Sequence, residues 1–149
     1  MGRSSDYMAL SVQVIDKKRL MMWAESLPAT PERVTVLGGE RLWVCDEAVV
    51  LELMGQIVGA GTIAPKGECG DPKPSIIAIY VVPEFRDSIR EVDLLAQTIV
   101  RCSQRNLVPV RFDMISSRDV LAVNSLPEEL RQLLDARSYG GIMDLLMDY

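Results

Sequence analysis

The sequence predicts an α/β fold of the α+β kind, in which helices flank a central mixed sheet whose strands are mostly antiparallel. Segments with strand periodicity alternate with segments of helical periodicity, and glycine-centred turns join neighbouring strands in the middle of the chain. With 149 residues, of which 48% are apolar, the chain can bury a full core. We therefore expect one domain over residues 1–149, with residues 1–8 flexible or vector-derived.

The first part of the chain is predicted to form a strand, a helix and a hairpin. Apolar and polar residues alternate over residues 9–15, which is typical of a strand, and Asp16 can cap the helix that follows. Pro31 interrupts the helical periodicity. Residues 34–37 and 41–44 then flank a Gly-Gly pair, which suits a tight turn and predicts an antiparallel hairpin.

A second hairpin is predicted in the middle of the chain, where residues 49–54 and 57–63 are rich in strand-forming residues. Gly59 and Gly61 lie inside the second of these strands, and they indicate a bulge or a close approach of another backbone. The apolar run 76–82 follows a polar loop and predicts a buried strand.

The last third of the chain is predicted to contain three helices and two strands. Helical periodicity covers residues 87–103, and alternation over residues 108–115 predicts a strand. Ser116 can cap a short helix. A Ser-x-x-Glu capping box begins another predicted helix over residues 125–139, and residues 142–149 are expected to add a closing strand.

The charge balance argues against partners that carry many phosphates. The chain has 16 basic and 21 acidic side chains and a net charge of −5, so it offers little attraction to nucleic acid or to an anionic membrane. Its longest apolar run is 7 residues. A membrane-spanning helix needs about 20 residues. We expect a cytoplasmic protein.

The absence of histidine excludes serine-histidine and cysteine-histidine catalysis and removes the commonest metal ligand. Cys45, Cys69 and Cys102 are widely spaced and form no C-x-x-C pair, which favours a reducing compartment over a disulfide framework. We therefore expect no metal site. Cys102 is predicted to lie on the buried face of its helix, so we assign no nucleophilic cysteine.

Two segments in the middle of the chain carry a resemblance to a known family. Residues 55–63 (GQIVGAGTI) form one segment, and residues 79–86 (IYVVPEFR) form the other. They resemble the hairpin into the third strand and the fourth strand with its exit in the GNAT acetyltransferase superfamily. The order of the predicted elements is also similar, and the resemblance extends over residues 49–115. It implies a sheet that splays at the fourth strand, where acetyl-CoA binds.

The resemblance implies a cofactor site at the end of that strand. In the family an arginine there opens a glycine-rich loop, whose backbone N–H groups meet the pyrophosphate of acetyl-CoA at a helix N-terminus. Arg86 keeps this position, but Asp87, Ile89 and Glu91 replace the loop glycines, so we expect impaired binding of acetyl-CoA or CoA. The implied cofactor contacts are Val81, Val82, Arg86, Ser88, Ile89 and Arg90.

The resemblance also implies a general acid, for which Tyr139 is the local candidate. Packing or helix capping is the simpler interpretation of a tyrosine there. Glu52 is a candidate general base for an acceptor amine. Because Glu52 alternates with Leu51 and Leu53, a solvent-facing strand residue is the simpler interpretation.

Two functions remain open from the sequence. The missing loop glycines favour a GNAT-like protein with impaired acetyl-CoA binding, which acts as a binding or regulatory module for an unidentified protein partner. The alternative is an active acetyl-CoA-dependent N-acetyltransferase that acts on a small primary amine, with Arg86 and Arg90 on the pyrophosphate. A homodimer is compatible with both, because methionines and the apolar tail can form a partner surface.

Overall fold

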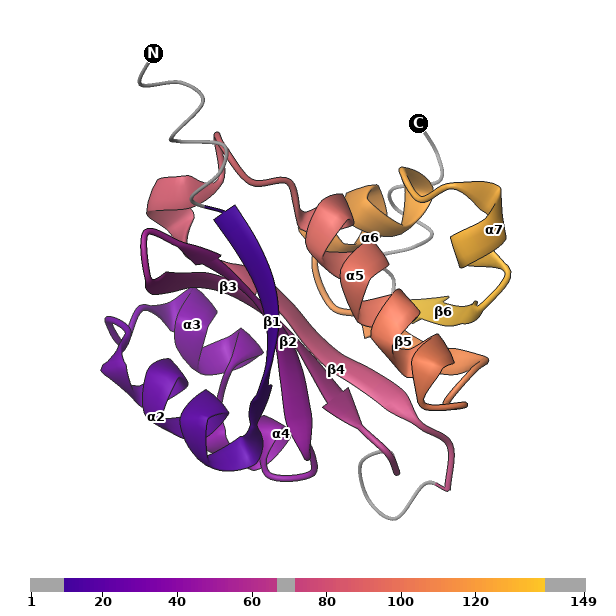
Figure 1. The fold of residues 1–149 in the computed structure, drawn as a ribbon, viewed down its shortest axis with the longest axis horizontal. Coiled ribbons are helices and arrows are strands. Elements are labelled where there is room, and N and C mark those ends of the chain that lie inside the picture. Colours follow the sequence, from indigo (N-terminus) through magenta and orange to yellow (C-terminus); the bar gives the residue numbers. More distant parts are fainter. Residues whose placement is uncertain (1–9, 67–71, 139–149) are drawn as a thin grey trace.

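The computed structural model describes residues 10–66 and 72–138, which form a six-stranded sheet with helices on both faces (Figure 1). The strands follow their chain order: β1 (Leu10–Asp16), β2 (Glu47–Leu53), β3 (Gln56–Ala64), β4 (Ser75–Val81), β5 (Val110–Met114) and β6 (Leu134–Ser138). Strands β1 to β4 pair antiparallel, whereas β5 is parallel to β4 and β6 is parallel to β5. The predicted mixed, mostly antiparallel sheet is confirmed.

Three helices connect β1 to β2. They are α2 (Lys17–Ser26), α3 (Pro31–Val36) and α4 (Gly39–Leu42). Asp16 caps α2 as predicted, since its carboxylate accepts a hydrogen bond from the Arg19 N–H at 2.9 Å. Leu20 and Ala24 lie on the buried face of this helix, as the helical periodicity indicated.

The predicted hairpin over residues 34–37 and 41–44 is wrong, because this region forms α3 and α4. Thr30 caps α3 by accepting from the Arg33 N–H, and Pro31 takes the first helical position. Proline at that position starts a helix, since its missing N–H would have no intrahelical partner there anyway. Gly38 has φ −60° and acts as the N-cap of α4, so the Gly-Gly pair makes no tight turn.

The hairpin between β2 and β3 is confirmed, and its turn lies at Met54 and Gly55, both with positive φ. Gly61 in β3 is a site of close approach, although side-chain atoms and not a backbone make this approach. A Cβ atom on Gly61 would lie 2.0 Å from Oγ1 of Thr98 in the long helix α5 (Glu91–Gln104). That hydroxyl donates to the Leu94 carbonyl at 2.7 Å, which holds it in place. The missing side chain therefore lets α5 pack directly on β3.

The chain leaves β4 through a short 3-10 turn, η2 (Pro83–Phe85), and α5 begins only at Glu91. The helix therefore starts four residues after the predicted boundary at residue 87. Ile89 is buried in the core and anchors this connection between η2 and α5. Its apolar side chain contributed to the helical periodicity although the residue precedes the helix.

The predicted helix over residues 125–139 is also wrong. Ser116 caps α6 (Ser117–Asn124) as expected, but Ser125 ends that helix, with its hydroxyl donating to the Leu121 carbonyl. Only the four-residue helix α7 (Glu128–Arg131) follows, and β6 then pairs with β5. The backbone groups of β6 are satisfied by parallel pairing with β5, and pairing with a distant segment leaves no signal in the local periodicity. The strand predicted at residues 142–149 lies outside the described residues.

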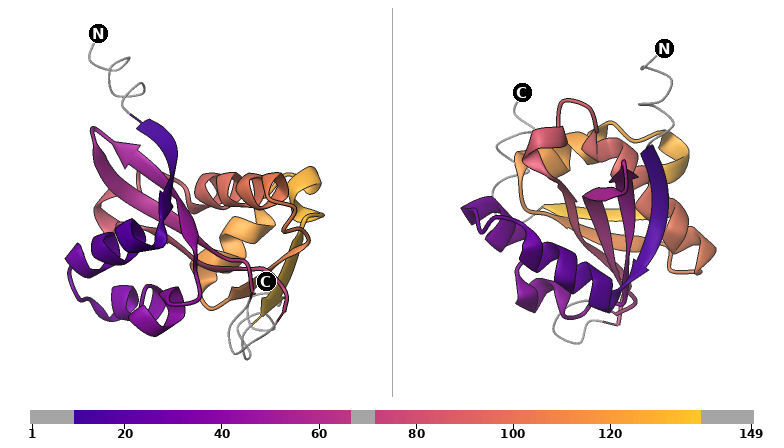
Figure 2. Two further views of the ribbon diagram at one scale, coloured as in Figure 1. Left: turned by 60° about the horizontal axis from the view of Figure 1, so that its bottom comes forward. Right: turned by 60° about the vertical axis from the view of Figure 1, so that its left-hand side comes forward.

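Figure 2 shows helices on both faces of the sheet, and an apolar core lies on each face. Helices α2 to α4 cover one face, where Leu20 and Leu42 are fully buried. Helices α5 and α6 cover the other, which contains Leu94, Ile99 and Phe112. Within the described ranges, no helix is long and apolar enough to cross a membrane.

Candidate functional site

The candidate site lies where β4 and β5 separate. Ser75 and Ile76, at the start of β4, are the residues that pair with β5. At the other end, the Val82 N–H donates to the Val58 carbonyl of β3 at 2.9 Å. Because peptide groups alternate in direction along a strand, the N–H and C=O of Val81 face the β5 side. We call this gap beside Val81 the β4–β5 opening.

The side chain of Arg86 turns back into the β4–β5 opening. Its Nε donates to the Val81 carbonyl at 3.0 Å, and its guanidinium lies over the Tyr80 ring, 5.4 Å from the centroid. Its Nη2 forms an ion pair with Glu32 of α3 at 2.8 Å. With only 14% of its side chain exposed, Arg86 is held at a fixed place on the strand end.

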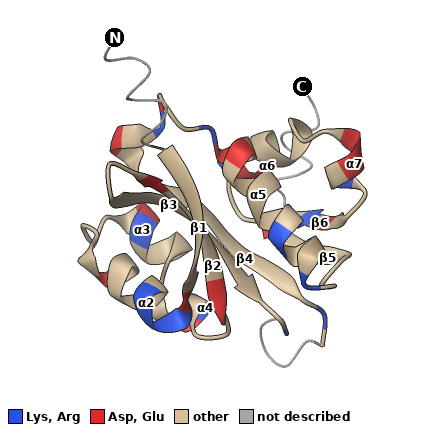
Figure 3. Ribbon diagram, viewed as in Figure 1, with Lys and Arg blue, Asp and Glu red and all other residues tan. Residues whose placement is uncertain are grey.

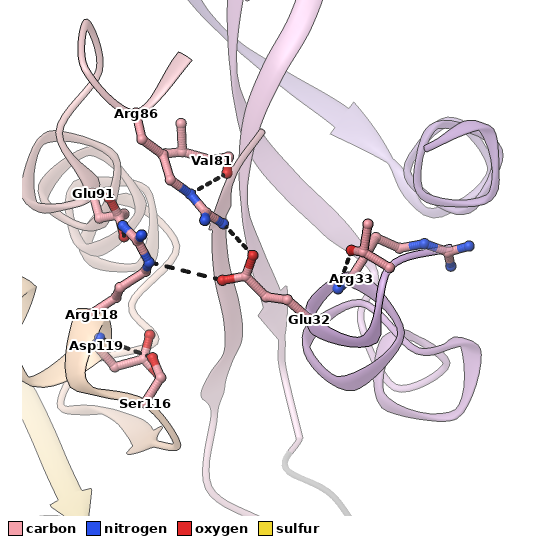
Figure 4. Close-up of polar contacts among 9 residues, drawn as sticks. Glu32, Arg33, Val81, Arg86, Glu91, Ser116, Arg118 and Asp119 are labelled. Carbon is pink, nitrogen blue, oxygen red and sulfur yellow. Dashed lines mark hydrogen bonds and ion pairs between the residues drawn. The ribbon is translucent and has the colours of Figure 1, made fainter. Parts of the chain in front are cut away.

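Glu32 and Arg118 continue this network across the opening (Figure 4). One Glu32 oxygen binds Arg86, and the other lies 3.9 Å from Nε of Arg118 in α6. Arg118 in turn lies 3.5 Å from Glu91, the first residue of α5. Charged side chains from α3, α5, α6 and the exit of β4 therefore meet at one place.

An open cavity of about 250 Å³ adjoins this network between α5 and α6. Its lining includes Arg86, Arg90, Arg118 and Glu91, together with the apolar residues Val92 and Leu121. The three arginines are each paired with a carboxylate: Arg86 with Glu32, Arg118 with Glu91, and Arg90 with Asp93 at 3.1 Å. Figure 3 shows acidic and basic segments side by side around this end of α5. The cavity thus carries guanidiniums that are already neutralised.

The loop between β4 and α5 is closed on itself. The N–H groups of Ser88 and Ile89 both donate to the Phe85 carbonyl, at 3.0 and 2.9 Å. Asp87 and Ser88 are exposed, whereas the Ile89 side chain is buried. Two of the amides expected to meet a pyrophosphate are therefore engaged in a turn that the buried isoleucine holds in place.

Asp119 of α6 is a buried carboxylate beside this network. Its Oδ2 accepts the Ile115 N–H at 2.9 Å, and its own N–H donates to the Ser116 hydroxyl. Burial raises the pKa of Asp119 to about 6, against the lowering effect of the Ile115 hydrogen bond and of Arg41. Glu91 adds a smaller upward contribution to the same pKa.

Comparisons with known proteins were made with the sequence and with the structure. A scan against protein-family models finds no match, and a comparison with curated proteins also finds none. Among solved structures, the chain is similar to an aminoglycoside acetyltransferase from an uncultured soil metagenomic sample, solved with trehalose and with sisomicin. The TM-score is 0.50 at 15% identity, over 78% of this chain and 84% of that one. The chain has the GNAT acetyltransferase fold.

A second similar structure is a predicted acetyltransferase from Clostridium acetobutylicum, solved with acetyl-CoA. It has a TM-score of 0.49 and 16% identity, over 77% of this chain and 86% of that chain. A third is a GCN5-related N-acetyltransferase from Ralstonia eutropha, with a TM-score of 0.45 and 13% identity, over 93% and 88%.

The β4–β5 opening lies where the resemblance to the GNAT superfamily implies the acyl group of acetyl-CoA, beside the splayed fourth strand. The Val81 N–H faces this opening, as that role requires. The Val82 N–H does not, since it donates to β3. Arg86 lines the opening as well as the cavity, whereas Arg90 is exposed and donates to Asp93 in the first turn of α5.

Of the two predicted catalytic residues, only Glu52 lies among the described residues, and it is not at the β4–β5 opening. Tyr139 lies outside them. Glu52 is half-buried on β2, where it pairs with Ser11 and Ile57, and β3 separates its strand from β4. Its role as a base therefore stays a prediction.

Sequence reasoning missed three residues of the site, namely Glu32, Arg118 and Tyr80. Glu32 and Arg118 lay in segments without a motif, and only the fold brings them to Arg86. Tyr80 lies within the predicted apolar strand over residues 76–82. Burial, and to a smaller extent Glu32, raise the pKa of its phenol. A tyrosine inside an otherwise aliphatic run was the one signal that could have pointed here.

Neither a metal site nor a reactive thiol is found in the described part of the chain. No group of three His, Cys, Asp or Glu side chains there could hold an ion. Burial raises the pKa of Cys102 to about 12, so this thiol stays protonated, as expected for a core residue. Cys45 is buried as well, and Cys69 lies outside the described residues.

Proposed function

We propose that this chain is a GNAT-fold protein with impaired acetyl-CoA binding, which acts as a binding or regulatory module rather than as an acetyltransferase. The observation that carries this proposal is the pairing of Arg86, Arg90 and Arg118 with Glu32, Asp93 and Glu91. A pyrophosphate entering the cavity would have to displace these carboxylates or accept their repulsion. Either route lowers its net binding free energy.

The loop supports the same proposal. For their amides to reach a phosphate, Ser88 and Ile89 would have to give up hydrogen bonds to Phe85, and the buried Ile89 side chain opposes that rearrangement. A net hydrogen bond is worth about 0.5–1.5 kcal/mol, and a Val- or Ile-sized side chain gains about 1.5–3 kcal/mol on burial. The free-energy cost of opening the loop therefore offsets a large share of the free energy gained from phosphate contacts.

Arg86 further obstructs acyl transfer. Its guanidinium occupies the β4–β5 opening and binds the Val81 carbonyl, next to the amide that would polarise a thioester. A thioester could reach that amide only after Arg86 moved away. The proposed partner of the module is an unidentified protein, and self-association into a homodimer is compatible with it.

Thermal unfolding with millimolar acetyl-CoA and CoA tests the proposal directly. A ligand at 100 times its Kd stabilises a protein by about 2.7 kcal/mol, so intact binding would be easy to detect. We expect little or no stabilisation of the wild-type chain. A clear rise in melting temperature with acetyl-CoA, together with acetyl transfer to any amine, would overturn the proposal.

Two double variants separate the causes of impaired binding. Asp87→Asn with Glu91→Gln removes charge alone, whereas Asp87→Gly with Glu91→Gly removes charge and restores backbone freedom. If repulsion and lost amide access both matter, CoA should stabilise the second variant more than the first, and the first more than the wild type. Equal responses of all three folded proteins would contradict this explanation.

An active N-acetyltransferase that acts on a primary amine is the second candidate. It is favoured by the opening itself, because the Val81 N–H still faces it. Thiol release from acetyl-CoA in the presence of a panel of primary amines tests this candidate. Activity that falls in Tyr139→Phe with unchanged acetyl-CoA binding would support a general-acid role, whereas no thiol release with any amine argues against the enzyme.

A further inference from the structure

Two arginines at the β4–β5 opening share one carboxylate of this chain. The two Glu32 oxygens are divided between them: Oε1 lies 2.8 Å from Arg86, and Oε2 lies 3.9 Å from Arg118. We propose that Arg86 and Arg118 form a binding site for a phosphoryl group, and that Glu32 is the internal occupant of this site when no ligand is bound. This inference rests on the proposed function, because a thioester in the opening would compete for the same space.

Arg86 is preorganised to hold an oxyanion. The Val81 carbonyl fixes its Nε, and the Tyr80 ring supports the face of its guanidinium. Neither contact involves Glu32, so the Nη2 edge stays in position when Glu32 leaves. A group that is already ordered loses little conformational entropy on binding, which favours affinity.

Glu32 is suited to being displaced. Its side chain is 39% exposed, and it belongs to α3, a six-residue surface helix. At 3.9 Å its second oxygen is too far from Arg118 for a hydrogen bond. A phosphoryl group offers three oxygens and a charge of about −1.5 to −2, so it can bind both guanidiniums at hydrogen-bond distance.

The surroundings limit what else the ligand can carry. The cavity between α5 and α6 shares Arg86 and Arg118 with the site, and it also contains Val92 and Leu121. It can therefore take a small, partly apolar group attached to the phosphate. Glu91 faces the same cavity and disfavours a second phosphate next to the first. The chemistry fits a phosphate monoester, or free phosphate, better than a diphosphate.

This site differs in place from the cofactor site that the resemblance implied. There the phosphates would meet the amides of residues 88–90, ahead of α5. Here the phosphoryl group lies beside Val81, at the end of the opening where an acyl group was expected. A ligand bound in this way replaces the acyl group of a GNAT reaction.

Titration with inorganic phosphate at about 0.1 M ionic strength, followed by calorimetry, tests the inference. Glu32→Gln removes the internal occupant and should raise phosphate affinity by about ten-fold, which corresponds to about 1.4 kcal/mol. Glu40→Gln is the matched control, because it changes net charge equally from an exposed position in α4 whose side chain forms no hydrogen bond or ion pair with another described residue. It should change affinity by less than about two-fold.

Further variants separate charge from contact. Glu32→Asp keeps the charge but withdraws the carboxylate by one methylene, and it should raise phosphate affinity less than Glu32→Gln does. Adding Arg86→Met to Glu32→Gln should abolish the gain. Thermal unfolding without ligand shows whether each variant is folded. If Glu32→Gln is not folded, the phosphate affinity of Glu32→Asp is compared with that of the wild type instead.

The outcomes are decisive for this site. Equal affinities of Glu32→Gln and Glu40→Gln, or a gain that survives Arg86→Met, would overturn it. Comparing the affinities for glycerol phosphate and inorganic phosphate distinguishes an ester ligand from free phosphate. A higher affinity for the ester would show that the cavity binds its organic part, and equal affinities would identify free phosphate as the ligand. Acetyl-CoA stabilisation of the wild type would instead refute the proposed function, so the two failures are distinguishable.

Discussion

Both ends of α5 carry arginine–carboxylate pairs, but the pairs have different roles. At the C-terminal end, Arg101 and Arg105 reach Glu47 and Asp46 at the start of β2, at 2.6 and 2.8 Å, so they tie the helix to the sheet. At the N-terminal end, the pair between Glu91 and Arg118 faces a cavity. Arginine–carboxylate pairs therefore stabilise the fold where they connect a helix to the sheet. Where they connect two helices beside a cavity, they line a candidate site.

The largest expected effect lies between these two ends, where α5 is packed on β3. Gly61→Ala places a Cβ atom 2.0 Å from Oγ1 of Thr98 and should destabilise the fold by about 3 kcal/mol. Urea denaturation measures this loss. Gly39→Ala is the control, since a Cβ there meets nothing within 4 Å. Adding Thr98→Ala to Gly61→Ala should recover part of the loss, and no recovery would mean that the clash is not with that side chain.

The next largest effect concerns the N-terminal end of α5, where Asp119 lies beside Glu91. Because its folded pKa of about 6 is above the unfolded value, the protonated form is favoured in the folded protein. Stability should therefore fall as pH rises from about 4 to 6, by about 2 kcal/mol relative to Asp119→Asn. Unfolding curves across this pH range measure the difference. Asp87→Asn, at an exposed position, should run parallel to the wild type.

Two matched variants test whether the two ends of α5 contribute differently to stability. Glu47→Gln weakens the contacts of two arginines from a side chain only 14% exposed, and it should cost about 1–2 kcal/mol of stability. Glu91→Gln removes one longer contact, at 3.5 Å, from a side chain that is 16% exposed, and it also relieves the repulsion of Asp119, so it should cost less, about 0.5 kcal/mol. Equal losses in denaturant titrations would show that both ends of α5 serve the fold alike.

The smallest effect is expected from Arg90→Ala. Arg90 precedes α5 and pairs with Asp93 of its first turn, and 74% and 60% of the two side chains are exposed. We expect no measurable change in melting temperature. A clear loss would show that pairs at the cavity contribute to stability, as the pairs at the C-terminal end of α5 do.

The sequence predicted the sheet well because its strands alternate or form apolar runs, and because Asp16 and Ser116 cap helices through local contacts. It failed where a local signal had two meanings. Pro31 can end one helix or start the next, and here it starts α3. The segment that forms β6 had helical periodicity, and only its pairing with β5, far away in the sequence, makes it a strand.

The candidate site was predictable only in part. Arg86 and the replaced glycines are adjacent in the chain, so a local motif identified them. Glu32 lies 54 residues from Arg86, and the two residues pair because the fold places α3 near the exit of β4. The sequence could not indicate this contact, because residues 34–37 were predicted to form a strand. Arg118 was unpredictable for the same reason. Its helix α6 lies at the opening only because β5 pairs parallel with β4.

The guanidiniums at the opening also bear on aggregation. A sheet that splays exposes an internal strand edge, which is a template for pairing with a strand of another chain. Arg86 binds the Val81 carbonyl and Arg41 binds the Ile77 carbonyl, so two acceptors on the splayed part of β4 are occupied by bulky cations. A protein with this sheet can keep a gap in its middle and still resist fibril growth from it.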